Sequence, residues 1–201
     1  LNIKTPREVM PVKVARGAYG DRYDWTDALL KEAGPQMQAM SFHQYTLPTG
    51  KWDVKAPALQ FTEADWIQTL HTTLLMDELV RKHSEVMDKH DPQKKIGLFV
   101  DEWGAWYDVE AGTNPGFLFQ QNTMRDAVLA VLNLNIFQGH ADRVRMANIA
   151  QMINVLQAMV LTDKEKMLVT PTYHVFEMYR PFKRASLLPV ELNTPQYTSG
   201  E

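Results

Sequence analysis

Segments typical of strands alternate with segments typical of helices along most of the chain, and this alternation restricts the folds that the chain can adopt. Short, largely apolar runs typical of strands lie at residues 12–18, 37–45, 96–103 and 144–155. Stretches typical of helices lie at residues 24–34, 61–89, 123–137 and 169–179. Strands that alternate with helices form right-handed β-α-β units around a parallel sheet.

About four such units are present, half of the eight that close a (β/α)8 barrel. We therefore expect an α/β fold that forms part of a TIM barrel. After Pro181 the pattern loosens into a β-like stretch that Pro189 interrupts, which predicts the beginning of an all-β domain. Two segments stay ambiguous, since residues 144–155 also allow a helix and residues 169–179 also allow an extended connection.

The composition excludes several classes of function. The 201 residues include no cysteine, which excludes disulfides, thiolate metal sites and a cysteine nucleophile. The net charge of -3 gives no basic surface for nucleic acid, and no apolar stretch approaches the roughly 20 residues that cross a bilayer. The spacing of the histidines suits no metal. We expect a soluble protein without metal or cofactor, cytoplasmic or secreted, and a piece of a longer chain, because residues 1–6 contain neither an initiator Met nor a signal core.

Two adjacent acids, Asp101 and Glu102, end the apolar run at residues 96–103. Barrel enzymes place their working groups at the C-terminal ends of strands, so Glu102 is a candidate catalytic carboxylate. Trp103 and Trp106 lie beside it in the sequence, and aromatic faces next to a carboxylate suit a sugar ring. The local pattern also allows two solvated loop acids.

A second polar group ends the run at residues 37–45, where alternation places Ser41, His43 and Tyr45 on one face of the strand. His43 and Tyr45 are candidates to hold a nucleophilic carboxylate or to bind a hydroxyl group, although a core histidine has the same pattern. Farther along, Gln151 lies in an apolar segment that contains several amides. A buried amide needs a partner, which is either a ligand hydroxyl or neighbouring backbone.

In this order, the segments resemble the α-L-arabinofuranosidases of glycoside hydrolase family 51. The matching stretches are residues 41–45, 97–107, 139–155 and 169–176, within a resemblance that covers about residues 10–182. The resemblance implies a (β/α)8 barrel followed by a β-sandwich, and retaining hydrolysis of terminal α-L-arabinofuranosyl linkages in arabinose-containing oligo- or polysaccharides. Residues 1–180 would then supply about strands five to eight of the barrel, and residues 181–201 the start of the sandwich.

The resemblance also implies roles for the candidate residues. Glu102 would be the nucleophile at the end of the seventh strand. Tyr45, at the end of the sixth, would contact that carboxylate or the sugar, and Gln151, at the eighth, would bind an arabinose hydroxyl. Trp103 and Trp106 would line the pocket.

One catalytic group is missing from the pattern. A retaining glycosidase uses two carboxyl groups about 5–5.5 Å apart, and in this family the general acid/base ends the fourth strand in an Asn-Glu pair, which this sequence lacks. We therefore expect an inactive segment that needs the N-terminal half of the barrel, from another chain or from further residues of the same one, and we expect an oligomer. A glycosidase acting on another linkage, such as a β-glucan, and a non-catalytic carbohydrate-binding or assembly fragment stay open as alternatives.

Overall fold

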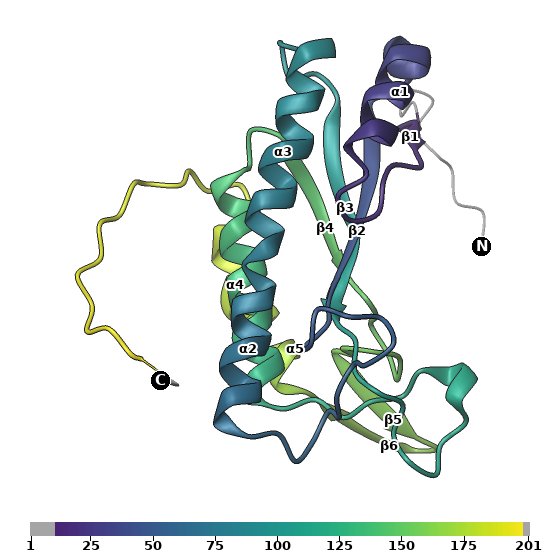
Figure 1. Cartoon of the computed structure of the whole chain (residues 1–201), viewed down its shortest axis with the longest axis vertical. Coiled ribbons are helices and arrows are strands. Elements are labelled where there is room, and N and C mark those ends of the chain that lie inside the picture. Colours follow the sequence, from purple (N-terminus) through teal and green to yellow (C-terminus); the bar gives the residue numbers. More distant parts are fainter. Residues whose placement is uncertain (1–10, 199–201) are drawn as a thin grey trace.

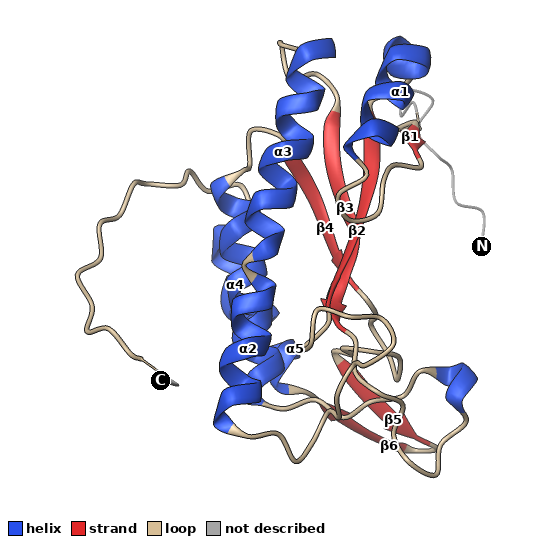
Figure 2. Ribbon diagram, viewed as in Figure 1, coloured by secondary structure: helices blue, strands red, loops and turns tan. Residues whose placement is uncertain are grey.

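A parallel sheet forms the centre of the molecule. The structure is a computed structural model, and it describes residues 11–198. The sheet has four strands in the order β1 (Val14–Ala15), β2 (Ala39–Thr46), β3 (Gly97–Ala105) and β4 (Val144–Ile149), each parallel to its neighbour. Figure 2 shows these strands running side by side in red. The predicted α/β class with a parallel sheet is confirmed.

Helices connect the strands and cover one face of the sheet (Figure 1). They are α1 (Tyr23–Ala33), α2 (Glu63–Thr73), α3 (Leu75–His90), α4 (Met124–Gly139) and α5 (Pro171–Tyr179), with short 3-10 turns at Gly34–Gln36, Pro115–Phe117 and Arg180–Phe182. One continuous core contains Leu30 of α1, Val80 of α3, Ala130 of α4 and Val175 of α5 together with strand residues such as Leu98. The helices therefore share one side of the sheet.

The predicted helix at residues 61–89 is two helices, because the chain breaks at Leu74. Thr62 starts α2 with a capping box that includes Asp65, as the sequence indicates. Near its end, the hydroxyl groups of Thr69, Thr72 and Thr73 donate to backbone carbonyls four residues earlier. Such bonds compete with the helical ladder and bend it.

The second half of the chain departs from the predicted pattern in three places. The ambiguous segment at residues 144–155 is a strand only as far as Ile149. A hairpin that the pattern does not predict follows, formed by the antiparallel strands β5 (Val160–Asp163) and β6 (Lys166–Val169). Residues 186–192 form no strand and extend away from the body in Figure 1, with exposed leucines. Residues 1–10 and 199–201 of the two expected parts lie outside the described residues.

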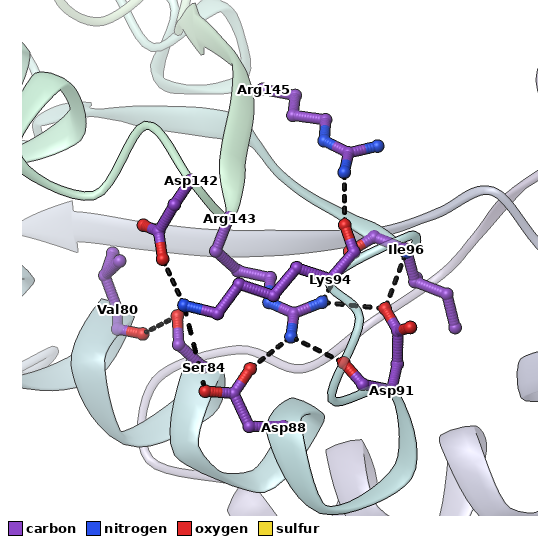
Figure 3. A network of polar contacts seen from close by, with 9 residues as sticks. All are labelled: Val80, Ser84, Asp88, Asp91, Lys94, Ile96, Asp142, Arg143 and Arg145. Carbon is purple, nitrogen blue, oxygen red and sulfur yellow. Dashed lines mark hydrogen bonds and ion pairs between the residues drawn. The ribbon is translucent and has the colours of Figure 1, made fainter.

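A buried charge network holds the N-terminal ends of β3 and β4 (Figure 3). Arg143 immediately precedes β4, and its side chain is 1% exposed. It donates to the carboxylate of Asp91 at 2.9 Å, to the backbone oxygen of Ile96 at 2.9 Å and to the backbone oxygen of Asp91 at 3.0 Å. It also pairs with Asp88 near the end of α3. These contacts join the end of α3 to the starts of two strands, at the end of the sheet where stabilising residues concentrate in barrels.

Candidate active site

A bulge at the C-terminal ends of β2 and β3 shapes the site. The register pairs Ser41 with Phe99 but His43 with Glu102, so β3 contains one more residue than β2 over this interval. A bulge of this kind re-aims a side chain next to it. As a result, the side chains of Asp101 and Glu102 are exposed to a similar extent, 33% and 36%, although neighbours in a regular strand point to opposite faces.

The imidazole of His43 lies between the two carboxylates. Its Nδ1 is 2.9 Å from Oε2 of Glu102, and its Nε2 is 2.9 Å from Oδ1 of Asp101. The His43 side chain is 32% exposed, so it belongs to the surface of the site rather than to the core. One ring therefore restricts the orientations of both carboxylates.

Tyr45 lies next to Glu102 on the buried side of the site. It is 4% exposed, and its burial, the negative charge of Glu102 and a hydrogen bond to Glu102 all raise the pKa of Tyr45. The phenol therefore stays neutral at ordinary pH and donates to the carboxylate. This hydrogen bond holds the Glu102 carboxylate in position at the end of β3.

Trp103 does not line the site, so the prediction for this residue is wrong. Its side chain is 0% exposed and packs against Phe137 of α4 and Phe176 of α5, with ring centroids 5.3 and 6.1 Å away. The side chain therefore faces the helix layer, on the side opposite to Glu102. Trp106 is half-buried, and its ring centroid is 4.9 Å from that of Tyr45.

Gln151 lies in the loop that follows β4. Its backbone amide donates to Val155 at 3.1 Å and its carbonyl accepts from Met159 at 3.3 Å, while its side chain is exposed. The amide side chain is thus on a fixed backbone and open to a ligand. The amide of Asn154 instead finds its partners within the chain, because it pairs with the backbone and hydroxyl of Thr162.

One aromatic residue at the site has no signal in the sequence pattern. Trp52 lies in the loop between β2 and α2, and its ring centroid is 5.2 Å from that of Trp106. A single tryptophan in a loop rich in Pro and Gly has no periodic neighbours that would mark it. Its proximity to Trp106 becomes evident only when the ends of β2 and β3 are placed side by side.

Within residues 11–198, the structure supports neither a metal site nor a membrane-spanning helix. No group of three or more histidine, aspartate or glutamate side chains in this range is placed to hold a metal ion. None of the helices described is long and apolar enough to cross a membrane.

Comparison with known proteins identifies the family. A family model described as the α-L-arabinofuranosidase C-terminal domain matches residues 101–201, which begin at the carboxylate pair. The chain belongs to the glycoside hydrolase family 51 α-L-arabinofuranosidases. This membership confirms the resemblance found in the sequence.

Relatives with known structures or curated names agree with the family. An intracellular exo-α-L-arabinofuranosidase of Bacteroides ovatus is 47% identical over 90% of this chain and 35% of its own length. The crystal structure of the family 51 arabinofuranosidase from Xanthomonas axonopodis pv. citri has a TM-score of 0.93 and 56% identity over 98% of this chain and 40% of that protein. An α-L-arabinofuranosidase from Thermotoga maritima, solved as an arabinose complex, has a TM-score of 0.65 and 26% identity over 82% of this chain and 30% of its own. The chain thus spans well under half the length of these arabinofuranosidases.

Proposed function

We propose that this chain supplies the nucleophile half of a retaining α-L-arabinofuranosidase, which releases terminal α-L-arabinofuranosyl residues from arabinose-containing oligo- or polysaccharides. The observation that carries the proposal is the convergence of His43, Tyr45 and Glu102 at the C-terminal ends of two neighbouring parallel strands. The family and the names of the relatives support the substrate.

The four strands of the sheet correspond, on this proposal, to strands five to eight of a (β/α)8 barrel. Residues 1–180 belong to the barrel, and residues 181–201 start the β-sandwich. Two features support this division. The helices lie on one face of the sheet, and the opposite face exposes side chains such as Met146, 43% exposed, that another part of a barrel would cover. The partner is therefore the N-terminal half of the barrel.

The reaction proceeds by two displacements. The Glu102 carboxylate attacks the anomeric carbon, and the bond from that carbon to the leaving oxygen breaks as a general acid outside residues 1–201 protonates the oxygen. The product is a glycosyl ester on Glu102. The same external group, now a base, then takes a proton from water, which attacks the anomeric carbon and releases arabinose with the original configuration.

The surrounding side chains prepare Glu102 for the attack. Tyr45 donates a hydrogen bond to the carboxylate, and His43 restricts its rotation. On this proposal Gln151 binds the sugar through its amide, which is exposed, and Trp106 binds it through its ring, which lies next to Tyr45. An oriented nucleophile contributes to rate because less freedom is lost on the way to the transition state.

Replacing Tyr45 with phenylalanine should lower kcat about 10- to 100-fold, because a hydrogen bond to a charged group contributes about 1.5–3 kcal/mol. Steady-state kinetics of the complete enzyme on an aryl α-L-arabinofuranoside measures the effect. Tyr179→Phe is the matched control, since the Tyr179 phenol donates to Asn135 at 2.6 Å, away from the site. Equal rates for wild type and Tyr45→Phe would contradict the role of the phenol.

The function itself is tested with a panel of substrates. The complete enzyme should release arabinose from an aryl α-L-arabinofuranoside and from arabino-oligosaccharides, and NMR should show the α-anomer as the first product. This chain without the N-terminal half should release none. Glucose release from a β-glucan without arabinose release would assign the site to another linkage. Binding of arabino-oligosaccharides by the complete protein without turnover would assign it a non-catalytic function.

A further inference from the structure

Four aromatic side chains form a continuous row that leads outward from Glu102. In order they are Tyr45, Trp106, Trp52 and Tyr19, and we call them the aromatic row. Successive ring centroids are 4.9, 5.2 and 5.7 Å apart. Tyr45 ends β2, Trp106 follows β3, and Tyr19 follows β1 and bridges to His43. The row therefore crosses the C-terminal ends of three neighbouring strands.

Exposure increases along the aromatic row. Tyr45, which hydrogen-bonds to Glu102, is 4% exposed, whereas Trp52 and Tyr19 are each 41% exposed. The inner ring, Tyr45, thus contacts Glu102, and the outer rings are accessible at the surface of residues 11–198. An exposed tryptophan next to a site is typical of a contact surface, because its ring offers a large rigid area to a ligand.

The loop that carries Trp52 is held at both ends by the chain that follows β3. The amide of Trp106 donates to Thr46 at 3.1 Å, and the amide of Asp108 donates to Ala56 at 3.0 Å. Lys55 fixes the middle, since its ammonium donates to the Trp52 carbonyl at 2.6 Å and lies 5.4 Å from the centre of the Trp52 ring. The exposed ring is therefore preorganised, which reduces the entropy that a ligand must overcome on binding.

We propose that Trp52 and Tyr19 form a binding platform for the sugar on the leaving-group side of the scissile bond. The terminal arabinose must touch Glu102, so it occupies the inner end, next to Tyr45 and Trp106. The next sugar of the chain lies one step outward, where Trp52 and Tyr19 offer apolar faces to its C–H groups and Lys55 offers a donor to its hydroxyls. This inference rests on the proposed function.

The test compares two substrates that share the arabinosyl group and differ in the leaving group. In the complete enzyme, Trp52→Ala should lower kcat/KM for arabinotriose about 10-fold, the size expected for loss of one aromatic contact. The loss should be clearly smaller for methyl α-L-arabinofuranoside, because methanol does not reach the platform. Trp52→Phe should recover most of the loss, because it restores an aromatic face.

Trp25→Ala is the matched control. Trp25 is 50% exposed on α1, outside the aromatic row, and its removal should affect neither substrate. An equal loss on both substrates with Trp52→Ala, or no loss on arabinotriose, would overturn the platform. If the wild-type enzyme released arabinose from neither substrate, both the proposed function and the platform would fail. This result is distinguishable from the two Trp52→Ala outcomes because it appears without any mutation.

Discussion

Replacing Glu102 with glutamine should lower kcat of the complete enzyme by at least about 10⁴-fold, as expected for loss of a covalent nucleophile. Glutamine has nearly the same shape, and the Glu102 side chain is 36% exposed, so the fold should not change. The amide cannot form the glycosyl ester. Release of nitrophenol from a nitrophenyl α-L-arabinofuranoside measures the loss, and the unfolding temperature checks the structure.

A second variant separates the nucleophile from the general acid. In Glu102→Ala, added azide should attack the anomeric carbon, displace nitrophenolate and give an arabinofuranosyl azide of inverted configuration, which NMR identifies. Glu85→Gln is the control, because Glu85 pairs with Arg81 on the exposed surface of α3 and should affect neither rate nor product. Turnover by Glu102→Gln at a rate similar to that of wild type would show that the nucleophile is another group.

Replacing Arg143 with alanine should destabilise the protein by about 3–5 kcal/mol, because removal of one partner leaves a buried charge without compensation. Arg143 is 1% exposed, and its partner Asp91 is 9% exposed. Urea unfolding of the complete enzyme, followed by circular dichroism, measures the change in midpoint. Arg81→Ala is the control, since that arginine is 50% exposed in a surface pair and should cost less than about 1 kcal/mol. Equal midpoints for Arg143→Ala and wild type would contradict the structural role.

The same network predicts how stability depends on pH. Burial opposes ionisation of Asp91, but hydrogen bonds from the amides of Ile96 and Lys95 and from Arg143 outweigh burial and lower the pKa of Asp91. The pKa of Asp91 is therefore lower in the folded protein than in the unfolded chain, where it is about 3.9. This difference stabilises the folded protein above about pH 3.9, and the stabilisation is lost as the pH falls through the pKa of Asp91 in the folded protein. Without Arg143 the folded pKa rises, so acid unfolding should begin at a higher pH in Arg143→Ala.

The sequence predicts the β-α-β alternation because apolar periodicity directly reflects which face is buried. The break at Leu74 is not predicted, since three threonines that donate to the backbone interrupt a helix without changing its apolar spacing. The hairpin of β5 and β6 is also missed. Its residues are largely exposed, as at Met167 and Leu168, and a strand with little burial shows little hydrophobic alternation.

The candidate site, too, can be predicted from the sequence only in part. Glu102 can be predicted because an acid at the end of a buried strand is a local pattern. Its approach to His43 depends on the register between two strands about 60 residues apart, and the bulge that sets this register leaves no local signal. Trp103, adjacent to Glu102 in the sequence, faces the helices instead.

The loop between β2 and α2 is held by hydrogen bonds to its backbone, and these bonds do not depend on which side chains the loop carries. Thr46 and Ala56 accept hydrogen bonds through their backbone oxygens, which every amino acid has. Arg125 likewise donates to the backbone oxygens of Pro57 and Ala58. Substitutions between these points therefore change the exposed side chains of the segment without removing the hydrogen bonds that hold it. A randomised library confined to residues 48–55 would therefore test whether this segment sets the polymer preference of the proposed enzyme.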